Sequence, residues 1–399
     1  MSLKRIKDES NFSEGQAKAY DEFFKFLNNK SKKMFVISGL QGCGKSYLVS
    51  KISVYLKEIG LDFVIATYTG KASSVLIDRG AISQTIHSLI YKPIIEDGTG
   101  RIIGWKRNDN IPYDLIIIDE FSMLSKKMIL DLLFYGVKVL FVGDVNQLPN
   151  PQEDTNYLED KIDVHLTEIL RQAKGNPIIE NSLLALKGFS FKKGFLARNE
   201  QGVFMTIDRY NYDRIEKLMD RVDIMICGTN KLRHFLNTKY REIKGIKEIL
   251  VPNDKLVILK NNEKFNVFNG QIATIYSYGE IYQNEIGMKC IEAETSLGSL
   301  ILNYDIIEKQ DYDFNKEISL KYNRIRNDKD FIEPVFTNYA HALTCHKMQG
   351  SQAKSIMVFG YDLLFMKYMN KDKVKGEELY RRALYTSLGR AEVNCVLVI

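Results

Sequence analysis

The sequence predicts an α/β protein with two doubly wound parallel-sheet domains, a projecting β-hairpin and an inserted small β-barrel. Short apolar runs alternate with helical segments up to about residue 165, and the same alternation returns after it. This pattern is typical of parallel strands joined by crossover helices. The hairpin and the barrel are predicted because a glycine-punctuated excursion interrupts the first alternation and a run of strand-like segments interrupts the second.

The composition is ordinary for a globular protein. The chain has 399 residues, 45% of them hydrophobic and 27% charged, which is enough for two or three domains. No apolar run is long enough to span a bilayer, and the polar start MSLKRIKDES lacks a signal core, so we expect a cytoplasmic protein without a membrane partner. Five cysteines without a C-x-x-C pair indicate free thiols. The net charge of +6 permits a polyanionic partner without requiring one.

The first domain carries a glycine-rich loop between a strand and a helix. A helix is expected over residues 16–27, then the strand MFVIS, and the loop lies in VISGLQGCGKSYLV, residues 36–49. Its G-x-x-x-x-G-K-[ST] spacing predicts backbone N–H groups that surround phosphates. Lys45 is expected to reach the β- and γ-phosphates, and the Ser46 hydroxyl to bind Mg²⁺. The residues predicted to hold a nucleoside triphosphate here are Gly39, Gly42, Cys43, Gly44, Lys45 and Ser46.

Two further apolar strands of this domain end in polar residues. DLIIIDE, residues 114–120, ends in Asp119 and Glu120, and KVLFVGD, residues 138–144, is followed by Gln147. In a phosphate-loop enzyme, a carboxylate such as Asp119 holds Mg²⁺ through water. The neighbouring Glu120 can polarise a water for attack on the γ-phosphate, and the Gln147 amide can contact both that water and the phosphate. This set predicts hydrolysis of the nucleotide rather than phosphate transfer to a metabolite.

The rest of the chain supplies the hairpin, the second domain and the barrel. The excursion at residues 91–112 contains the only tryptophan, Trp105, and indicates two short strands around a turn. The second α/β unit has its clearest strand at residues 222–227, and the apolar runs SIMVFG and CVLVI complete its sheet. Strand-like segments around Asn269-Gly270 predict the barrel. The expected boundaries are 1–165 for the first domain, 166–250 plus 332–399 for the second, and 251–331 for the barrel.

A Thr-x-His sequence occurs in each α/β unit. Thr85 stands two positions before His87, and Thr344 two positions before His346, which Lys347 follows. Such residues commonly cap helices, but Thr, His and Lys also bond phosphate oxygens of nucleic acids. Their matching placement, one per unit, favours a shared tract along a strand of nucleic acid.

Taken in order along nearly the whole chain, these motifs resemble those of the superfamily 1 helicases, specifically the Dda-type and RecD-like DNA helicases of the 5′-to-3′ branch. SEGQ (residues 13–16), GLQGCGKS, IIIDE and GDVNQLP resemble the family's nucleotide motifs. LTEILRQ (166–172) and GTNK (228–231) resemble two later motifs, and TCHKMQGSQ (344–352) resembles the specific pattern T-x-H-K-x-Q-G. VFNGQIATI (267–275) resembles the strand and turn of an inserted barrel of Src-homology-3 type.

The resemblance implies two RecA-like domains, ATP and Mg²⁺ as cofactors, and further site residues. Gln16 corresponds to the adenine-reading residue, Arg171 and Arg390 to γ-phosphate contacts, and Gln349 and Gly350 to a nucleotide-contacting motif. The implied activity is 5′-to-3′ translocation on single-stranded DNA with duplex separation at the hairpin. The residues expected to contact nucleic acid are Tyr68, Thr69, Lys71, Thr85, His87, Trp105, Thr229, Asn230, Thr344, His346 and Lys347.

The resemblance also sets expectations for partners and context. The expected partners are single-stranded DNA and forked duplex DNA, with a single-strand-binding or replication protein as a further candidate. We expect a monomer that serves DNA replication, recombination or repair, and a phage origin would place it in the host cytoplasm. Two alternative functions stay open at this point: an RNA helicase of the viral superfamily 1 type, and an ATP-switched non-motor subunit of a RecD-like nuclease complex.

Two motifs depart from the family pattern. Tyr68 stands where proline is usual, in ATYTGKA, and Gly389 stands where threonine is usual, directly before Arg390. The first change affects a segment expected to contact bases, and the second keeps the catalytic charge. Trp105 has two interpretations, because a large aromatic side chain either packs the hairpin base onto the domain or acts as a wedge at the hairpin tip that stacks on the last base pair.

Overall fold

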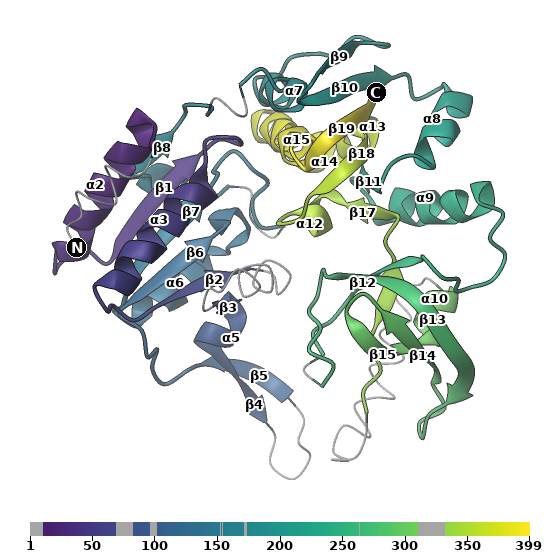
Figure 1. The fold of residues 1–399 in the computed structure, drawn as a ribbon, viewed down its shortest axis with the longest axis horizontal. Coiled ribbons are helices and arrows are strands. Elements are labelled where there is room, and N and C mark those ends of the chain that lie inside the picture. Colours follow the sequence, from purple (N-terminus) through teal and green to yellow (C-terminus); the bar gives the residue numbers. More distant parts are fainter. Residues whose placement is uncertain are drawn as a thin grey trace.

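The computed structural model describes residues 11–68, 83–95, 102–151, 153, 155–170, 174–262, 264–309 and 332–399. These residues form two six-stranded sheets, one five-stranded sheet and one two-stranded sheet. Figure 1 shows the two larger sheets beside each other, with the five-stranded sheet below the second. Three predicted site residues, Thr69, Lys71 and Arg171, lie outside the described residues.

The first sheet is entirely parallel, with the strand order β3-β2-β6-β7-β1-β8. The four apolar residues at the start of central strand β6 are fully buried, as expected for a strand covered on both faces. Helices α2 and α3 pack on one face of the sheet, and α5 and α6 on the other. The predicted doubly wound domain is therefore present. Its elements are α2 (Glu14–Asn28), β1 (Met34–Gly39), α3 (Lys45–Glu58), β2 (Phe63–Thr67), β3 (Ser83–Thr85), α5 (Ile86–Ile90), β6 (Leu115–Asp119), the 3₁₀ turn Phe121–Met123, α6 (Lys126–Phe134), β7 (Lys138–Gly143), the 3₁₀ turn Glu159–Lys161 and β8 (Val164–Leu166).

Between α5 and β6 the chain leaves this domain as two antiparallel strands, β4 (Tyr91–Ile95) and β5 (Ile102–Arg107). They point away from the sheet at the lower edge of Figure 1. Trp105 lies within β5, in register with Pro93. It is therefore a strand residue rather than a residue of the connecting turn, which corrects the expectation that its ring occupies the hairpin tip.

The second large sheet has the strand order β17-β11-β18-β19-β10-β9, and only β9 is antiparallel to its neighbour. The predicted strands at residues 222–227, SIMVFG and CVLVI are present, whereas β9 and β10 were not predicted individually. The elements of this domain are α7 (Pro177–Leu186), β9 (Leu196–Asn199), β10 (Gly202–Ile207), α8 (Tyr212–Met219), β11 (Ile224–Cys227), α9 (Asn230–Ile243), β17 (Ala342–Thr344), α12 (Cys345–Met348), β18 (Ala353–Phe359), α13 (Gly360–Leu363), α14 (Phe365–Met369), α15 (Lys373–Leu388) and β19 (Ala391–Val398).

The inserted segment forms a five-stranded antiparallel sheet with its own apolar core. Its last strand, β16, pairs with β12, so the sheet continues past the predicted boundary at residue 331. That this sheet is a barrel of Src-homology-3 type stays a prediction. Its elements are β12 (Lys255–Ile258), β13 (Ile272–Gln283), β14 (Lys289–Thr295), β15 (Gly298–Asn303), α10 (Tyr304–Lys309) and β16 (Thr337–Tyr339).

A buried polar cluster joins this small sheet to the second domain. Arg241 at the end of α9 donates a hydrogen bond to the Asp254 carboxylate at 2.5 Å, and the two side chains are 8% and 1% exposed. His341 Nε2 lies 3.4 Å from the same carboxylate, and its ring stacks on Tyr240 with the centroids 4.0 Å apart. Removing one partner of such a pair leaves an uncompensated buried charge, which typically costs about 3–5 kcal/mol.

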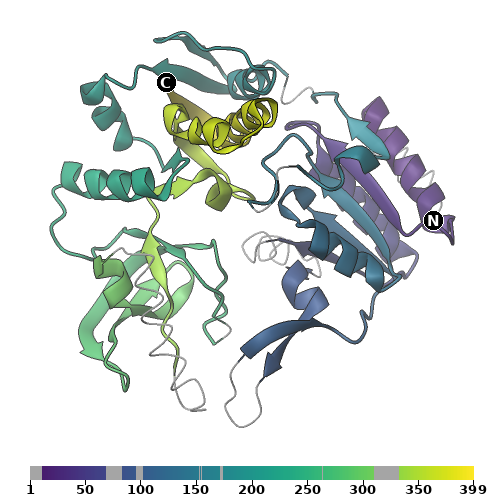
Figure 2. The ribbon, with the colours of Figure 1, turned by 180° about the vertical axis from the view of Figure 1, so that it is seen from behind.

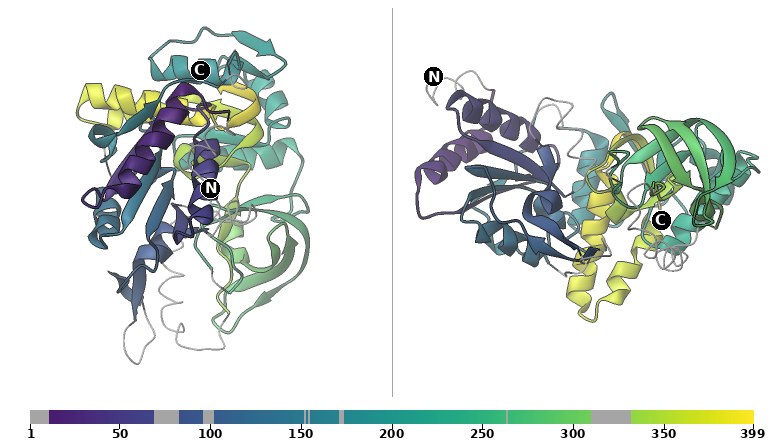
Figure 3. Two further views of the ribbon diagram at one scale, coloured as in Figure 1. Left: turned by 60° about the vertical axis from the view of Figure 1, so that its left-hand side comes forward. Right: turned by 90° about the horizontal axis from the view of Figure 1, so that it is seen from below.

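Helix α15 lies on the side of the second domain that faces the first. Arg382 donates to the Val145 carbonyl at 3.0 Å, and the Thr386 hydroxyl accepts from the Leu148 backbone N–H at 3.0 Å. Figures 2 and 3 show this arrangement from behind, from one side and from below, with α15 in yellow. One helix therefore provides much of the contact to the segment that follows β7.

Candidate functional site

The glycine-rich loop has the local geometry that its sequence predicts. Gly42 and Gly44 have φ angles of 79° and 73°, a region that favours glycine. Gly44 is also the N-cap of α3, so the backbone N–H groups of the first turn face the loop. The Lys45 ammonium donates to the carbonyls of Gly39 and Leu40 at 2.8 and 3.0 Å. The loop and its lysine therefore form the cradle expected for an anionic ligand.

Gln16 is bound to this loop rather than exposed beside it. Its amide nitrogen donates to the carbonyls of Cys43 and Gly44 at 3.2 and 3.1 Å, and its oxygen accepts from the Ser13 backbone N–H at 3.0 Å. The residue is 1% exposed. A Cβ on Gly44 would lie 2.5 Å from the Gln16 amide nitrogen. In this structure the amide connects α2 to the loop, and reading of adenine by Gln16 stays a prediction.

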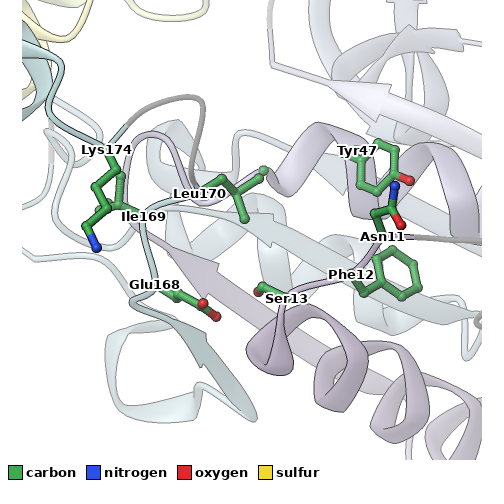
Figure 4. Close-up of a pocket in the computed structure, with 9 residues that line it drawn as sticks. Asn11, Phe12, Ser13, Tyr47, Glu168, Ile169, Leu170 and Lys174 are labelled. Carbon is green, nitrogen blue, oxygen red and sulfur yellow. The ribbon is translucent and has the colours of Figure 1, made fainter.

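A wide cavity of about 1360 Å³ opens on the outer side of the loop. Figure 4 shows Phe12, Ser13 and Tyr47 on one side of it, with Glu168 and Leu170 on the other. The Phe12 and Tyr47 rings make an edge contact, with their centroids 5.9 Å apart. Aromatic faces next to a phosphate loop offer a surface on which a nucleobase can stack. Of the residues that line this cavity, only Gly44 was a predicted site residue. The lining residues are Asn11, Phe12, Ser13, Gly44, Tyr47, Glu168, Ile169, Leu170 and Lys174.

The carboxylate pair stands at the carboxyl end of β6. Glu120 has φ 62° and ψ 54°, a left-handed conformation that is uncommon for a residue with a side chain and that concentrates at functional sites. Removal from water and the neighbouring Glu120 raise the pKa of Asp119 to about 6, against the opposing charge of Lys45. Ser46 is exposed and lines the same cavity as Glu120, the neighbour of Asp119. Hydroxyl and carboxylate oxygens suit a divalent cation, so Ser46 and Asp119 fit the predicted Mg²⁺ site.

Arg390 belongs to the second domain, and its side chain contacts Glu120 and Gln147 of the first domain. Its Nη2 donates to Gln147 Oε1 at 2.5 Å and to Glu120 Oε1 at 3.3 Å, and its Nε donates to the Thr386 carbonyl. Arg390 is 7% exposed and Gln147 3% exposed. Glu120, Gln147 and Arg390 therefore share one hydrogen-bond network, although 270 positions separate Glu120 from Arg390 in sequence.

These residues line one cavity of about 440 Å³ between the domains. Four polar residues that line it, Gln41, Asn176, Gln352 and Glu392, were not among the predicted site residues. Gln349 does not line it, because its amide donates to the Leu148 carbonyl at 2.9 Å and it is 2% exposed. The predicted nucleotide contacts of Gln349 and Gly350 stay predictions. The lining residues are Gln41, Gly42, Gly44, Lys45, Ser46, Glu120, Gln147, Asn176, Ile178, Ile179, Gln352, Gly389, Arg390, Ala391 and Glu392.

A third cavity, of about 600 Å³, is lined by most of the residues expected to contact nucleic acid. The first domain contributes Tyr68, Thr85 and His87, and the second contributes Asn230, Thr344, His346 and Lys347. The small sheet adds Asn261 and the Asn269-Gly270 turn, a contribution that the turn sequence alone did not reveal. The lining residues are Tyr68, Thr85, His87, Met123, Met128, Pro151, Gly228, Asn230, Arg233, Leu259, Asn261, Asn269, Gly270, Thr344, His346 and Lys347.

The polar groups of this cavity differ in how they are engaged. Lys347 Nζ donates to Asn269 Oδ1 at 2.7 Å, and burial and the charge of Arg233 lower the pKa of Lys347. Burial lowers the pKa of His87 and of His346, so both imidazoles favour the neutral form. Thr229 lies outside the lining, because it caps α9 and its hydroxyl bonds Asp362.

Trp105 lies next to this cavity. It is 51% exposed, and its ring makes an edge-to-face contact with His87, with the centroids 4.4 Å apart. A half-exposed ring retains a face on which a base can stack. The hairpin strand and the cavity are therefore joined through His87, while the two interpretations of Trp105 stay open.

A phosphate loop, Glu120 and an arginine from a second parallel-sheet domain, all lining one cavity, define a nucleoside-triphosphate-binding protein with two RecA-like domains. The comparisons with known proteins give the particular family resemblance. A family model described as an AAA domain matches residues 26–152. The ATP-dependent RecD2 DNA helicase of Deinococcus radiodurans is 32% identical over 178 residues, which is 42% of this chain and 23% of that protein.

One further sequence relative agrees with this result, and one solved structure agrees with the fold. The ATP-dependent DNA helicase PIF3 of Trypanosoma brucei brucei is 30% identical over 164 residues, 36% of this chain and 19% of that protein. The fold matches that of Pif1 helicase from Bacteroides, solved with ADP-AlF3 and single-stranded DNA, with a TM-score of 0.51 and 16% identity over 97% of this chain and 92% of that one. The resemblance to superfamily 1 helicases of the RecD/Pif1 type is confirmed.

The matched part of the chain spans less than a quarter of the length of either curated relative. Over the part of the chain that the structure describes, no helix is both long and apolar enough to cross a membrane.

Proposed function

We propose that the chain is an ATP-dependent DNA helicase that moves 5′ to 3′ on single-stranded DNA and unwinds duplex DNA. The observation that carries this proposal is the pair of cavities that both large domains line. One holds the phosphate loop and Arg390, and the other holds both Thr-x-His sequences. A change in the spacing of the domains alters both cavities at once. The helicase names of the sequence relatives support the same activity.

The cavity that holds the phosphate loop and Arg390 is called the nucleotide cavity here. Each residue of this site has a role that follows from its position. Lys45 neutralises phosphate charge, and Glu120 orients and deprotonates the attacking water. Gln147 accepts a hydrogen bond from Arg390 and is expected to contact that water, while the Arg390 guanidinium stabilises charge on the γ-phosphate. Mg²⁺ held by Ser46 and Asp119 would add Lewis-acid stabilisation of the phosphates. Because Arg390 belongs to the second domain, hydrolysis depends on the contact between the domains.

The cavity that holds both Thr-x-His sequences is called the strand cavity here. A strand of nucleic acid is expected to pass between its walls, which come from three parts of the fold. Thr85 and His87 face it from the first domain, and Thr344, His346 and Lys347 from the second. Contacts of this kind go to phosphates and sugars, and they hold a strand without reading its sequence. Single-stranded DNA and forked duplex DNA are the proposed partners, a single-strand-binding or replication protein is a further one, and the proposed active form is a monomer.

Duplex separation is assigned to the hairpin of β4 and β5. Stacking in DNA is worth about 1.4 kcal/mol per base-pair step, and stacking of a base on an aromatic side chain about 1–3 kcal/mol. A base that loses its neighbour can therefore be stabilised by a ring such as Trp105. The half-exposed position of Trp105 beside the strand cavity supports this assignment.

The experiment that tests the proposal compares forked duplexes that carry a 5′ or a 3′ single-stranded tail. We expect unwinding only from the 5′ tail and only with ATP and Mg²⁺. Unwinding from the 3′ tail alone would refute the polarity. ATP turnover stimulated by single-stranded RNA and not by DNA would establish the RNA helicase alternative. Absence of turnover by the isolated chain would favour a subunit that uses ATP only as a switch.

A further inference from the structure

The space for a side chain at position 389 is already occupied. Gly389 has φ −72° and ψ 4°, a conformation that any residue can adopt, so the backbone does not require glycine there. A Cβ built on Gly389 would lie 1.8 Å from Gln41 Oε1 and 2.1 Å from Gln41 Nε2. The carboxamide of Gln41 thus fills the position at which threonine is usual in the resembling motif.

Gln41 belongs to the phosphate loop of the first domain, and it forms hydrogen bonds with Tyr385 and Ser182 of the second domain. Its amide nitrogen donates to the Tyr385 carbonyl at 3.3 Å, and its oxygen accepts from the Ser182 hydroxyl at 3.3 Å. Its backbone N–H donates to the Tyr385 phenol oxygen at 2.8 Å. The same phenol donates to Asp144 Oδ2 at 2.5 Å, and Tyr385 is fully buried. The loop is therefore fastened to the last turns of α15.

The contacts of Gln41 with α15 reach Gly389, the residue directly before Arg390. The Gly389 backbone N–H bonds the Tyr385 carbonyl, which is also the acceptor for the Gln41 amide. Any displacement of the Gln41 carboxamide changes the contacts at the turn from which the Arg390 guanidinium reaches Gln147 and Glu120. Gln41 itself makes no hydrogen bond to Arg390, so its influence on that side chain acts through the α15 terminus.

We propose that Gln41 is a positioning residue that replaces the missing side chain at position 389 and holds Arg390 at the γ-phosphate position when the domains are in contact. This role rests on the proposed ATP hydrolysis. It makes the identities of residues 41 and 389 interdependent, because each determines the space left for the other. A side chain at 389 must displace the Gln41 carboxamide from the place where it bonds Tyr385 and Ser182. A smaller residue at 41 would leave that place free for threonine at 389.

The test is a set of variants measured for ATP turnover in saturating single-stranded DNA: Gln41→Ala, Gly389→Thr and the double variant. Gln41→Ala should lower kcat by about tenfold, as expected for the loss of two partly buried hydrogen bonds, with little change in KM. Gly389→Thr should lower kcat at least as much, because its side chain displaces the carboxamide. The double variant should exceed both single variants, because alanine at 41 makes room for threonine.

The controls separate this role from folding and from the proposed function. Gln283→Ala, at the exposed end of β13, should match the wild type, and the melting temperature of each variant checks its fold. If Gly389→Thr does not fold, the kcat of Gln41→Ala alone still tests the positioning role. Turnover by the wild type together with normal kcat in Gln41→Ala refutes the positioning role alone. A double variant no better than the worse single variant also refutes it. No turnover by the wild type refutes the helicase proposal and this role together.

Discussion

Replacing Arg390 by alanine tests whether the second domain supplies catalytic charge to the nucleotide. Arg390 contacts Gln147 and Glu120 with one guanidinium nitrogen. An arginine that reaches the γ-phosphate in the transition state typically contributes about 10³-fold or more to turnover, and 10³-fold corresponds to about 4 kcal/mol. The loss in free energy of unfolding is smaller, because a buried Gln147 oxygen without its donor costs about 1–3 kcal/mol. We therefore expect a large loss of kcat with a modest loss of stability.

The structure provides a matched control for this experiment. Arg382 lies on α15, the helix that ends shortly before Arg390, is 4% exposed and donates to Val145 and Glu159 of the first domain. It does not line the nucleotide cavity. Arg382→Ala therefore removes an equally buried inter-domain arginine without removing charge from the site. Steady-state ATP turnover with saturating single-stranded DNA is the assay, with strand binding measured by fluorescence anisotropy. A decrease in kcat of less than about tenfold in Arg390→Ala, or equal decreases in both variants, would refute the reasoning.

Three further predictions concern the other predicted roles. Lys45→Ala should abolish hydrolysis, while Glu120→Gln should retain ATP binding without turnover; normal turnover in Glu120→Gln would show that another group is the base. Trp105→Ala should slow unwinding of a forked duplex while melting temperature and DNA-stimulated turnover stay near normal, whereas a joint loss of all three would identify a packing residue. Lys347→Ala should weaken binding of single-stranded DNA and reduce its logarithmic salt dependence by roughly 0.7, the value for one phosphate contact; an unchanged slope would exclude that contact.

The parts of the fold that sequence predicts are those encoded locally. The apolar run that ends in Asp119 predicts a buried parallel strand, and the structure has one from Leu115 to Asp119. The glycine spacing predicts the phosphate loop because positive φ angles are needed at Gly42 and Gly44. Both signals lie within a few residues of the feature that they describe.

The contacts that sequence does not predict are those that depend on packing across the fold. Nothing in the periodicity relates Gln41 to Gly389, because their contact requires both domains to be assembled. Gln16 was expected to face the nucleobase, yet its amide is taken up by the loop carbonyls. One of the two interpretations of Trp105 placed its ring at the hairpin tip, but the strand register pairs Trp105 with Pro93.

The buried cluster of Arg241, Asp254 and His341 has a mechanical consequence for the whole molecule. Because a desolvated ion pair lies at the junction, we expect the small sheet and the second domain to move as one body. Asn269 of the small sheet also contacts Lys347 of the second domain, which adds a second link between the two parts. A rotation of the second domain against the first would therefore carry the small-sheet wall of the strand cavity with it.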